Sequence, residues 1–165
     1  MNKPEVPAQV IVMCGISGSG KTHYALQLEE EGFHRLSTDA IIWDKIGDKL
    51  FSLPKEEQKK LFANSRVEIF NKLYGLIEKG EKIVVDATHC KRSARDGIRK
   101  LCEKAKIKPI FIYCYTKKDI LWNRLSQRKG SGPDDLIVTK EELDSYWLGF
   151  ERPQNDETDI IFKKT

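Results

Sequence analysis

The sequence predicts an α/β fold in which a parallel sheet carries helices on both of its faces. Short apolar runs, typical of buried strands, alternate with segments of helical spacing along the whole chain. A glycine-rich loop joins the first apolar run to the first helix. Since β–α–β crossovers make successive strands parallel, ligands should bind where the carboxyl ends of the strands meet.

Local signals place the element boundaries. Gly32 and Gly80 end two helices, and Pro54 suits the first turn of a long one. Thr139 with Glu142 forms a capping-box pattern, and a Gly-Ser-Gly-Pro loop breaks the chain at 130–133. The predicted strands are 9–14, 33–37, 82–86, 107–115 and 159–162. The predicted helices are 22–31, 54–79, 91–104, 117–128 and 139–148, and a further segment opens at 38–39.

The long segment 54–79 has apolar residues at helical spacing, which by itself indicates ordinary core packing. Its apolar positions are Leu61, Phe62, Val67, Ile69, Phe70, Leu73, Tyr74 and Ile77.

Length and composition fit one globular domain spanning residues 1–165. Hydrophobic residues make up 39% and charged residues 33% of the chain. No apolar run approaches the ~20 residues of a membrane helix, and the first is too short for a signal peptide. We therefore expect a cytosolic protein, or a nuclear one if the source cell has a nucleus, without membrane partners and with its four cysteines reduced. The net charge of +4 is compatible with an anionic ligand such as a nucleotide.

Residues 15–22 read Gly-Ile-Ser-Gly-Ser-Gly-Lys-Thr, which has the G-x-x-x-x-G-K-[ST] form of the Walker A phosphate-binding loop. Its glycines free backbone N–H groups to bind phosphate at the start of a helix. Lys21 would contact the β- and γ-phosphates of ATP, and Thr22 would bind Mg²⁺. The alternative is a Gly/Ser-rich turn that only resembles the motif. The expected nucleotide-binding residues here are Gly15, Ser17, Gly18, Ser19, Gly20, Lys21 and Thr22.

Two acids follow predicted strands and should face this loop. Asp39 would act as the base that accepts the acceptor's proton, or alternatively cap the segment Ala40–Trp43. Asp86 ends the run Ile-Val-Val-Asp, as in a Walker B site. It would bind Mg²⁺ or fix the acceptor, or alternatively cap the next turn.

Arg124 and Arg128 are four residues apart on a predicted helix and should share a face. With the glycine-rich loop that follows, they predict a helical lid at about 124–138 that neutralises charge on the transferred phosphate. The alternative is a solvated basic face.

Three further signals carry less weight. His89 and Cys90 lack a second pair at metal spacing. Tyr113, Tyr115 and Trp122 indicate packing rather than a base-stacking platform. Residues 116–119 read Thr-Lys-Lys-Asp, which resembles a guanine-reading element, but the glycine of a GTPase switch is missing after Asp86.

Several segments together resemble polynucleotide-kinase-like and zeta-toxin-like P-loop kinases. Residues 86–89 read Asp-Ala-Thr-His and Arg95 follows, similar to the D-A-T-N-x-x-x-x-x-R signature of these kinases. Ser-Thr-Asp at 37–39 matches their strand-two acid, and the segment 124–128 resembles their lid. Glu-Arg-Pro at 151–153 resembles their C-terminal E-x-P stretch near the adenine.

The resemblance implies a three-layer P-loop fold with sheet order 2-3-1-4-5. It implies Asp39 as general base, Arg124 and Arg128 as phosphate clamps, and Arg95 as an acceptor-side residue with Asp39 and Asp86. Arg128 and Arg152 would also contact the nucleotide. Two positions depart from the pattern: Ile42 replaces the arginine that holds substrate phosphate, and His89 replaces the asparagine.

These observations predict an ATP- and Mg²⁺-dependent kinase that phosphorylates a hydroxyl. The acceptor could be a polynucleotide 5′-end, a nucleoside or another small molecule. Two alternatives remain: a switch module that hydrolyses ATP while binding a protein, and a nucleic-acid-binding protein with a vestigial nucleotide site. The sequence indicates neither the acceptor nor the oligomeric state.

Overall fold

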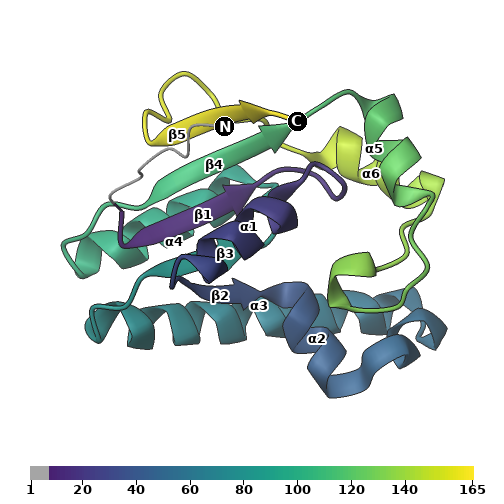
Figure 1. Cartoon of the computed structure of the whole chain (residues 1–165), viewed down its shortest axis with the longest axis horizontal. Coiled ribbons are helices and arrows are strands. Elements are labelled where there is room, and N and C mark those ends of the chain that lie inside the picture. The colour runs from purple at the N-terminus through teal and green to yellow at the C-terminus, as the bar shows by residue number, and fades with distance from the viewer. Residues whose placement is uncertain (1–7) are drawn as a thin grey trace.

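The computed structural model describes residues 8–165 and has a five-stranded parallel sheet at its centre (Figure 1). The strands lie in the order β2-β3-β1-β4-β5, which confirms the predicted fold and sheet order. Their bounds are β1 Val10–Cys14, β2 His34–Ser37, β3 Ile83–Asp86, β4 Ile110–Tyr115 and β5 Ile160–Lys164. The α-helices are α1 Lys21–Glu30, α2 Thr38–Ile46, α3 Lys55–Glu78, α4 Arg92–Lys104, α5 Lys118–Leu125 and α6 Lys140–Gly149. The short 3₁₀ helices are η1 Gly47–Ser52 and η2 Pro133–Asp135.

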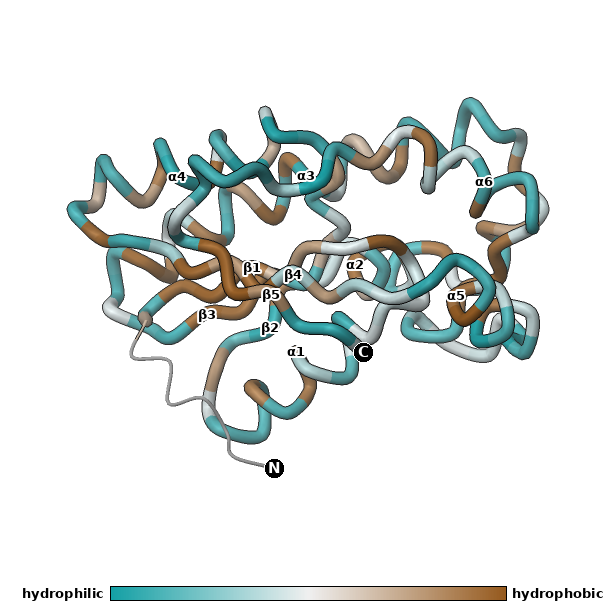
Figure 2. Tube along the Cα trace, turned by 90° about the horizontal axis from the view of Figure 1, so that it is seen from above, coloured by the Kyte–Doolittle hydropathy of each residue, from teal (hydrophilic) through white to brown (hydrophobic). Residues whose placement is uncertain are grey.

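The sheet separates two apolar layers because successive strand residues point to opposite faces. Val10 and Val12 face α3 and α4, whereas Ile11 and Met13 face α1. Seen from above, the strands form an apolar band with α3 and α4 on one side and α1 on the other (Figure 2). Because both faces are covered, all five residues of β1 are buried.

The long helix was predicted well, but not every apolar residue on it faces the core. Ile69, Leu73 and Ile77 are buried against the sheet, as expected from their spacing. Val67 is 62% exposed and Tyr74 is 44% exposed, so their assignment to the core face was wrong. A helix covers a sheet with one stripe only, and these two positions lie outside that stripe.

Several boundaries differ from those predicted. The fourth strand begins at Ile110 rather than at 107, directly after Pro109, which lacks an N–H for the ladder. Helix α5 ends at Leu125 instead of 128, and β5 continues to Lys164. The capping box at Thr139 and Glu142 is present as predicted. Within residues 8–165, no helix combines the length and apolarity needed to span a membrane.

Candidate functional site

The phosphate-binding loop connects β1 to α1 at the carboxyl edge of the sheet (Figure 1). Gly18 and Gly20 adopt φ angles of +83° and +90°, which side chains rarely tolerate. Within residues 8–165, the N–H groups of Gly20, Lys21 and Thr22 donate to no acceptor, as expected at a helix start. Such a row of free donors at the positive end of a helix can bind phosphate oxygens.

The start of this loop is packed against its neighbours. A Cβ atom on Gly15 would lie 2.4 Å from the backbone oxygen of Cys114 and 2.7 Å from Ser19 Oγ. Gly15 N also donates to the carbonyl of Thr88 over 3.1 Å, which ties the loop to the segment after β3. The glycine is therefore required by the close approach of β4.

Replacing Gly15 with alanine should destabilise the protein and weaken nucleotide binding, because the backbone of β4 cannot yield to a methyl group. We expect a loss of about 2 kcal/mol or more in the free energy of unfolding, measured by denaturant titration. The control is Gly149→Ala at the end of α6, where nothing lies within 4 Å of the added Cβ. That variant should match or exceed wild-type stability.

Lys21 is buried beneath the loop, where its Nζ donates to the carbonyl of Ile16 over 3.0 Å. Burial lowers the pKa of Lys21, whereas the nearby charges of Asp86 and Asp39 oppose that effect. The structure therefore brings the lysine and the two predicted acids into one electrostatic cluster at the carboxyl edge of the sheet.

Asp39 lies in the first turn of α2. The N-cap of this helix is Ser37, whose Oγ accepts a hydrogen bond from Ala40 N over 3.2 Å, so the alternative capping role of Asp39 was wrong. Burial, with the charge of Asp86 as the next cause, raises the pKa of Asp39 from 3.8 to about 6. A carboxylate with this pKa can accept a proton near neutral pH.

Asp86 ends β3 and has a partner that the sequence did not indicate. Arg35 of β2 donates to Asp86 Oδ2 from Nε over 3.0 Å and from Nη2 over 2.7 Å. The same guanidinium also binds Asp134 of η2. Arg35 belongs to no recognisable motif. The sequence indicated only that Asp86, if buried, requires a partner.

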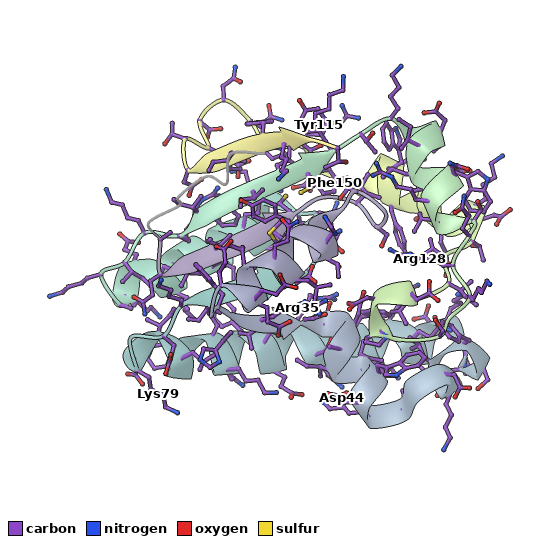
Figure 3. The ribbon with its side chains drawn as sticks, viewed as in Figure 1. Arg35, Asp44, Lys79, Tyr115, Arg128 and Phe150 are labelled. Atoms are coloured by element: carbon purple, nitrogen blue, oxygen red, sulfur yellow. The ribbon has the colours of Figure 1, made fainter. Side chains whose placement is uncertain are left out.

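The two lid arginines occupy different places, which corrects the prediction of one shared helix face. Arg124 lies in α5 and its Nη1 donates to the carbonyl of Gly18 over 3.0 Å. Arg128 follows the end of α5, and its Nη1 donates to the carbonyl of Leu136 over 3.2 Å. Arg128 interacts electrostatically with Asp39, and Figure 3 shows it between the α5 region and the α2 region.

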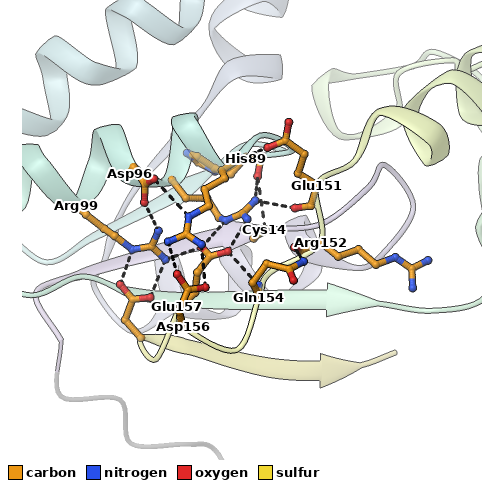
Figure 4. A network of polar contacts seen from close by, with 12 residues as sticks. Cys14, His89, Asp96, Arg99, Glu151, Arg152, Gln154, Asp156 and Glu157 are labelled. Carbon is orange, nitrogen blue, oxygen red and sulfur yellow. Dashed lines mark hydrogen bonds and ion pairs between the residues drawn. The ribbon is translucent and has the colours of Figure 1, made fainter.

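Arg95 is fully buried, and its hydrogen-bond partners belong to the polar network around Glu157 that Figure 4 shows. Its Nε and Nη2 donate to the carboxylate of Glu157 over 2.8 Å and 2.7 Å. Its Nη1 donates to the carbonyls of His89 and Glu151. In this structure, Arg95 thus joins α4 to the segment before β5, instead of taking the acceptor-side place that the resemblance implies.

Glu157 is the centre of this network. Burial by itself raises the pKa of Glu157, but hydrogen bonds from Arg95 and Arg99 outweigh it and lower the pKa to about 2.

Replacing Glu157 with glutamine should therefore cost about 3–5 kcal/mol of stability, because Arg95 loses its buried partner. Denaturant titration would test this. The matched control is Asp156→Asn, whose exposed pair with Arg92 should contribute less than about 1 kcal/mol.

His89 lies in the loop between β3 and α4 and contacts the end of β1. Its Nδ1 lies 2.9 Å from the carbonyl of Met13 and 3.2 Å from that of Ala87, so this nitrogen carries the proton. Burial lowers the pKa of His89, which favours the neutral ring. His89 stands where the D-A-T-N pattern has asparagine, and its side chain connects the β3–α4 loop to β1.

Two hollows flank the phosphate-binding loop. The larger, about 310 Å³, is lined by Gly18, Gly20, His23, Tyr24, Cys114, Arg124, Lys163 and Thr165. The smaller, about 40 Å³, includes Arg152, whose guanidinium lies 5.1 Å from the ring centre of Trp147. Tyr113 stacks on Phe150 and on Tyr115, with ring centres 5.6 Å and 5.4 Å apart, in agreement with the predicted packing role.

The residues of the cleft fit a nucleotide and Mg²⁺. Ser19 Oγ is buried and has no hydrogen-bond partner within the described residues, as expected of a group beside a bound anion. Thr22 and Asp86 offer hydroxyl and carboxylate oxygens, the ligand type that Mg²⁺ prefers. In the described part of the chain, no three His, Cys, Asp or Glu side chains form a metal cluster. Mg²⁺ bound here would take its other ligands from phosphate and water.

Comparison with solved structures supports the fold. A protein of Chloroflexus aurantiacus matches with a TM-score of 0.74 and 19% identity, over 98% of this chain and 89% of that chain. Kti12 of Chaetomium thermophilum, solved with ADP-AlF3, matches with a TM-score of 0.71 and 14% identity, over 94% and 88%. A gluconokinase of Sinorhizobium meliloti matches with a TM-score of 0.62 and 22% identity, over 94% and 81%.

Sequence comparison identifies the family more directly. No curated protein sequence matches this chain. The family model described as an AAA domain, however, matches residues 10–153, which include the phosphate-binding loop, both acids of the cleft and the lid arginines. The chain therefore belongs to this AAA-domain family, with a P-loop kinase-like fold.

Proposed function

We propose that this protein is an ATP- and Mg²⁺-dependent kinase that transfers the γ-phosphate of ATP to a hydroxyl group. The observation that carries the proposal is the cluster of Lys21, Asp39 and Asp86 beside the phosphate-binding loop. Phosphoryl transfer needs a phosphate cradle, cations for the developing charge and a group that orients the acceptor. These three side chains and the loop would supply them.

Each residue would have a definite part in the transfer. Asp39 would accept the proton of the acceptor hydroxyl as its oxygen attacks the γ-phosphorus. The bond from this phosphorus to the bridging β–γ oxygen would break, and ADP would leave. Lys21, Arg128 and the loop N–H groups would stabilise charge on the transferred group. Thr22 and Asp86 would hold Mg²⁺, which neutralises phosphate charge when bound.

We further propose that the protein works like the polynucleotide-kinase-like and zeta-toxin-like P-loop kinases. The chain would act as one domain over 1–165, with the lid at about 124–138, in the cytosol. Ile42 is 1% exposed and packs with Leu50 and Leu136, so α2 places no cation at this position. Because an apolar side chain stands where an arginine would hold substrate phosphate, we favour a nucleoside or other small-molecule acceptor over a polynucleotide.

The nucleoside end of ATP would lie in the larger hollow, which contains Arg124 and offers about 310 Å³, compared with about 40 Å³ beside Arg152. Arg124→Ala should then raise the Kd for ATP about fivefold, as expected for loss of a guanidinium–ring contact. Arg152→Ala, in contrast, should change it less than about twofold, because Arg152 packs on Trp147. Calorimetric titration with AMPPNP measures both. Equal losses in the two variants would contradict the placement of the base.

The direct test is incubation with γ-labelled ATP, Mg²⁺ and a panel of 5′-hydroxyl oligonucleotides, nucleosides, sugar acids and polyols. We expect label in a phosphorylated acceptor, and no label with Lys21→Met. Label in free phosphate alone across a broad panel would contradict the kinase proposal and favour an ATP-hydrolysing switch that binds a protein. Absence of nucleotide binding, together with salt-sensitive binding of RNA or DNA, would favour a vestigial site.

A further inference from the structure

Arg35 connects an acid at the end of the sheet to an acid in the lid. Its guanidinium donates twice to Asp86 Oδ2, and Nη2 also lies 2.6 Å from Asp134 Oδ1. The side chain of Arg35 is only 9% exposed, whereas that of Asp134 is 37% exposed. Figure 3 places Arg35 near the centre of the molecule. The partly exposed acid therefore completes the pairing of a nearly buried cation.

The lid segment 130–138 docks next to this pair. Leu136 is buried with Ile42 of α2 and Leu50 of η1. Gly130, with φ +71°, lies so close to Phe51 that an added Cβ would approach a ring carbon to 2.7 Å. Docking of the lid thus combines an apolar contact through Leu136 with a charged contact through Asp134.

The pairing with Arg35 also determines which carboxylate oxygen of Asp86 is left without a hydrogen bond in the described part of the chain. Both hydrogen bonds from Arg35 end on Oδ2, and within residues 8–165 no donor contacts Oδ1. Asp86 interacts electrostatically with Lys21 and Asp39, so its carboxylate is part of the proposed reaction centre. Two charged donors that converge on one oxygen hold that oxygen in place and leave the other oxygen without a hydrogen bond from the described residues.

We propose that Arg35 is a positioning residue that couples docking of the 130–138 segment to the orientation of Asp86. When the lid docks, Asp134 holds the guanidinium in place against Asp86 Oδ2, and Oδ1 stays free of hydrogen bonds from the described residues. When the lid leaves, Arg35 loses one of its two acidic partners and its hold on Asp86 weakens. The proposal deepens the proposed kinase function and rests on it for its biological meaning.

Hydrogen–deuterium exchange of peptides covering 130–138 tests the coupling without any acceptor or nucleotide. Asp134→Asn should raise exchange there by about fivefold, as expected for the loss of a partly exposed ion pair. Asp86→Asn should also raise exchange in these peptides. Asp86 lies on β3, outside the lid, so the effect of this substitution would reach the lid through Arg35. In an Arg35→Gln background, neither substitution should have a further effect.

Lys129→Gln is the matched control, since it changes the charge of the lid without touching Arg35. It should leave exchange as in the wild type. Arg35→Lys keeps the charge but loses the planar fork, so its exchange should resemble that of Arg35→Gln. If an Arg35 variant fails to fold, Asp134→Asn and Asp86→Asn still decide the question, because both leave Arg35 in place.

Three results would overturn the coupling: unchanged exchange in Asp134→Asn, wild-type exchange in Asp86→Asn, or an undiminished effect of Asp86→Asn when Arg35 is glutamine. The outcome is separate from that of the proposed function. A protein that shows the coupling but transfers no phosphate would contradict only the kinase proposal. A protein that transfers phosphate with an uncoupled lid would contradict only the role of Arg35.

Discussion

Replacing Lys21 with methionine is expected to reduce phosphoryl transfer by about 10³-fold or more, because Lys21 is the cation that we propose to contact the terminal phosphates from beneath the loop. The fold should persist. Methionine fills a similar volume, and burial already disfavours the charge that the lysine carries. Initial rates with γ-labelled ATP measure the effect, and circular dichroism reports whether the variant is folded.

Lys117→Met is the matched control for this experiment. Lys117 is exposed at the start of α5 and has the same charge and length. Its replacement should leave the rate within about twofold of wild type, because exposed charges are screened by solvent. A folded Lys21→Met protein with near-normal transfer would show that the loop does not bind the reacting phosphates.

Replacing Asp39 with asparagine should reduce kcat by about 10²-fold or more, while the affinity for ATP changes little. The amide retains the shape of the carboxyl group but accepts no proton from the acceptor. Comparing kcat with the Kd for AMPPNP separates the two effects. A variant that lost only ATP affinity would contradict the role of Asp39 as base.

The pH dependence gives a second test of Asp39. Its pKa is raised to about 6, and a base must be ionised to act. Activity of the wild type should therefore fall as the pH drops through about 6, with a slope of one. The residual activity of Asp39→Asn should lack this limb. A limb near pH 4 would indicate that the carboxylate is not buried as described.

The substitution Asp39→Asn should also stabilise the folded protein at neutral pH. Because the folded-state pKa of Asp39 lies above its unfolded value of 3.8, the folded state binds the proton more tightly between pH 4 and 6. Stability should therefore fall as the pH rises through this range, by about 1–3 kcal/mol at pH 7. Asp39→Asn removes this cost, so denaturant titration should show a more stable but inactive protein.

Local patterns determined much of the architecture. The strand–loop–helix around residues 15–22 and the alternation of strands and helices follow from glycine placement and apolar spacing, which act within a few residues. The proximity of Asp39 and Asp86 to Lys21 follows from these patterns as well, because parallel strands end at one edge. The sheet order came from the resemblance to known kinases, since strand spacing alone does not determine it.

The partners of the charged side chains were decided by the tertiary structure. Arg35 pairs with Asp86 and Asp134, which lie 51 and 99 residues further along the chain, and Arg95 pairs with Glu157 62 residues away. No periodicity links such positions. A helical spacing suggested that Arg124 and Arg128 act together, but α5 ends at Leu125 and separates them. A buried charge takes the partner that folding brings within hydrogen-bond distance, and this distance is set by the packing of whole helices and strands.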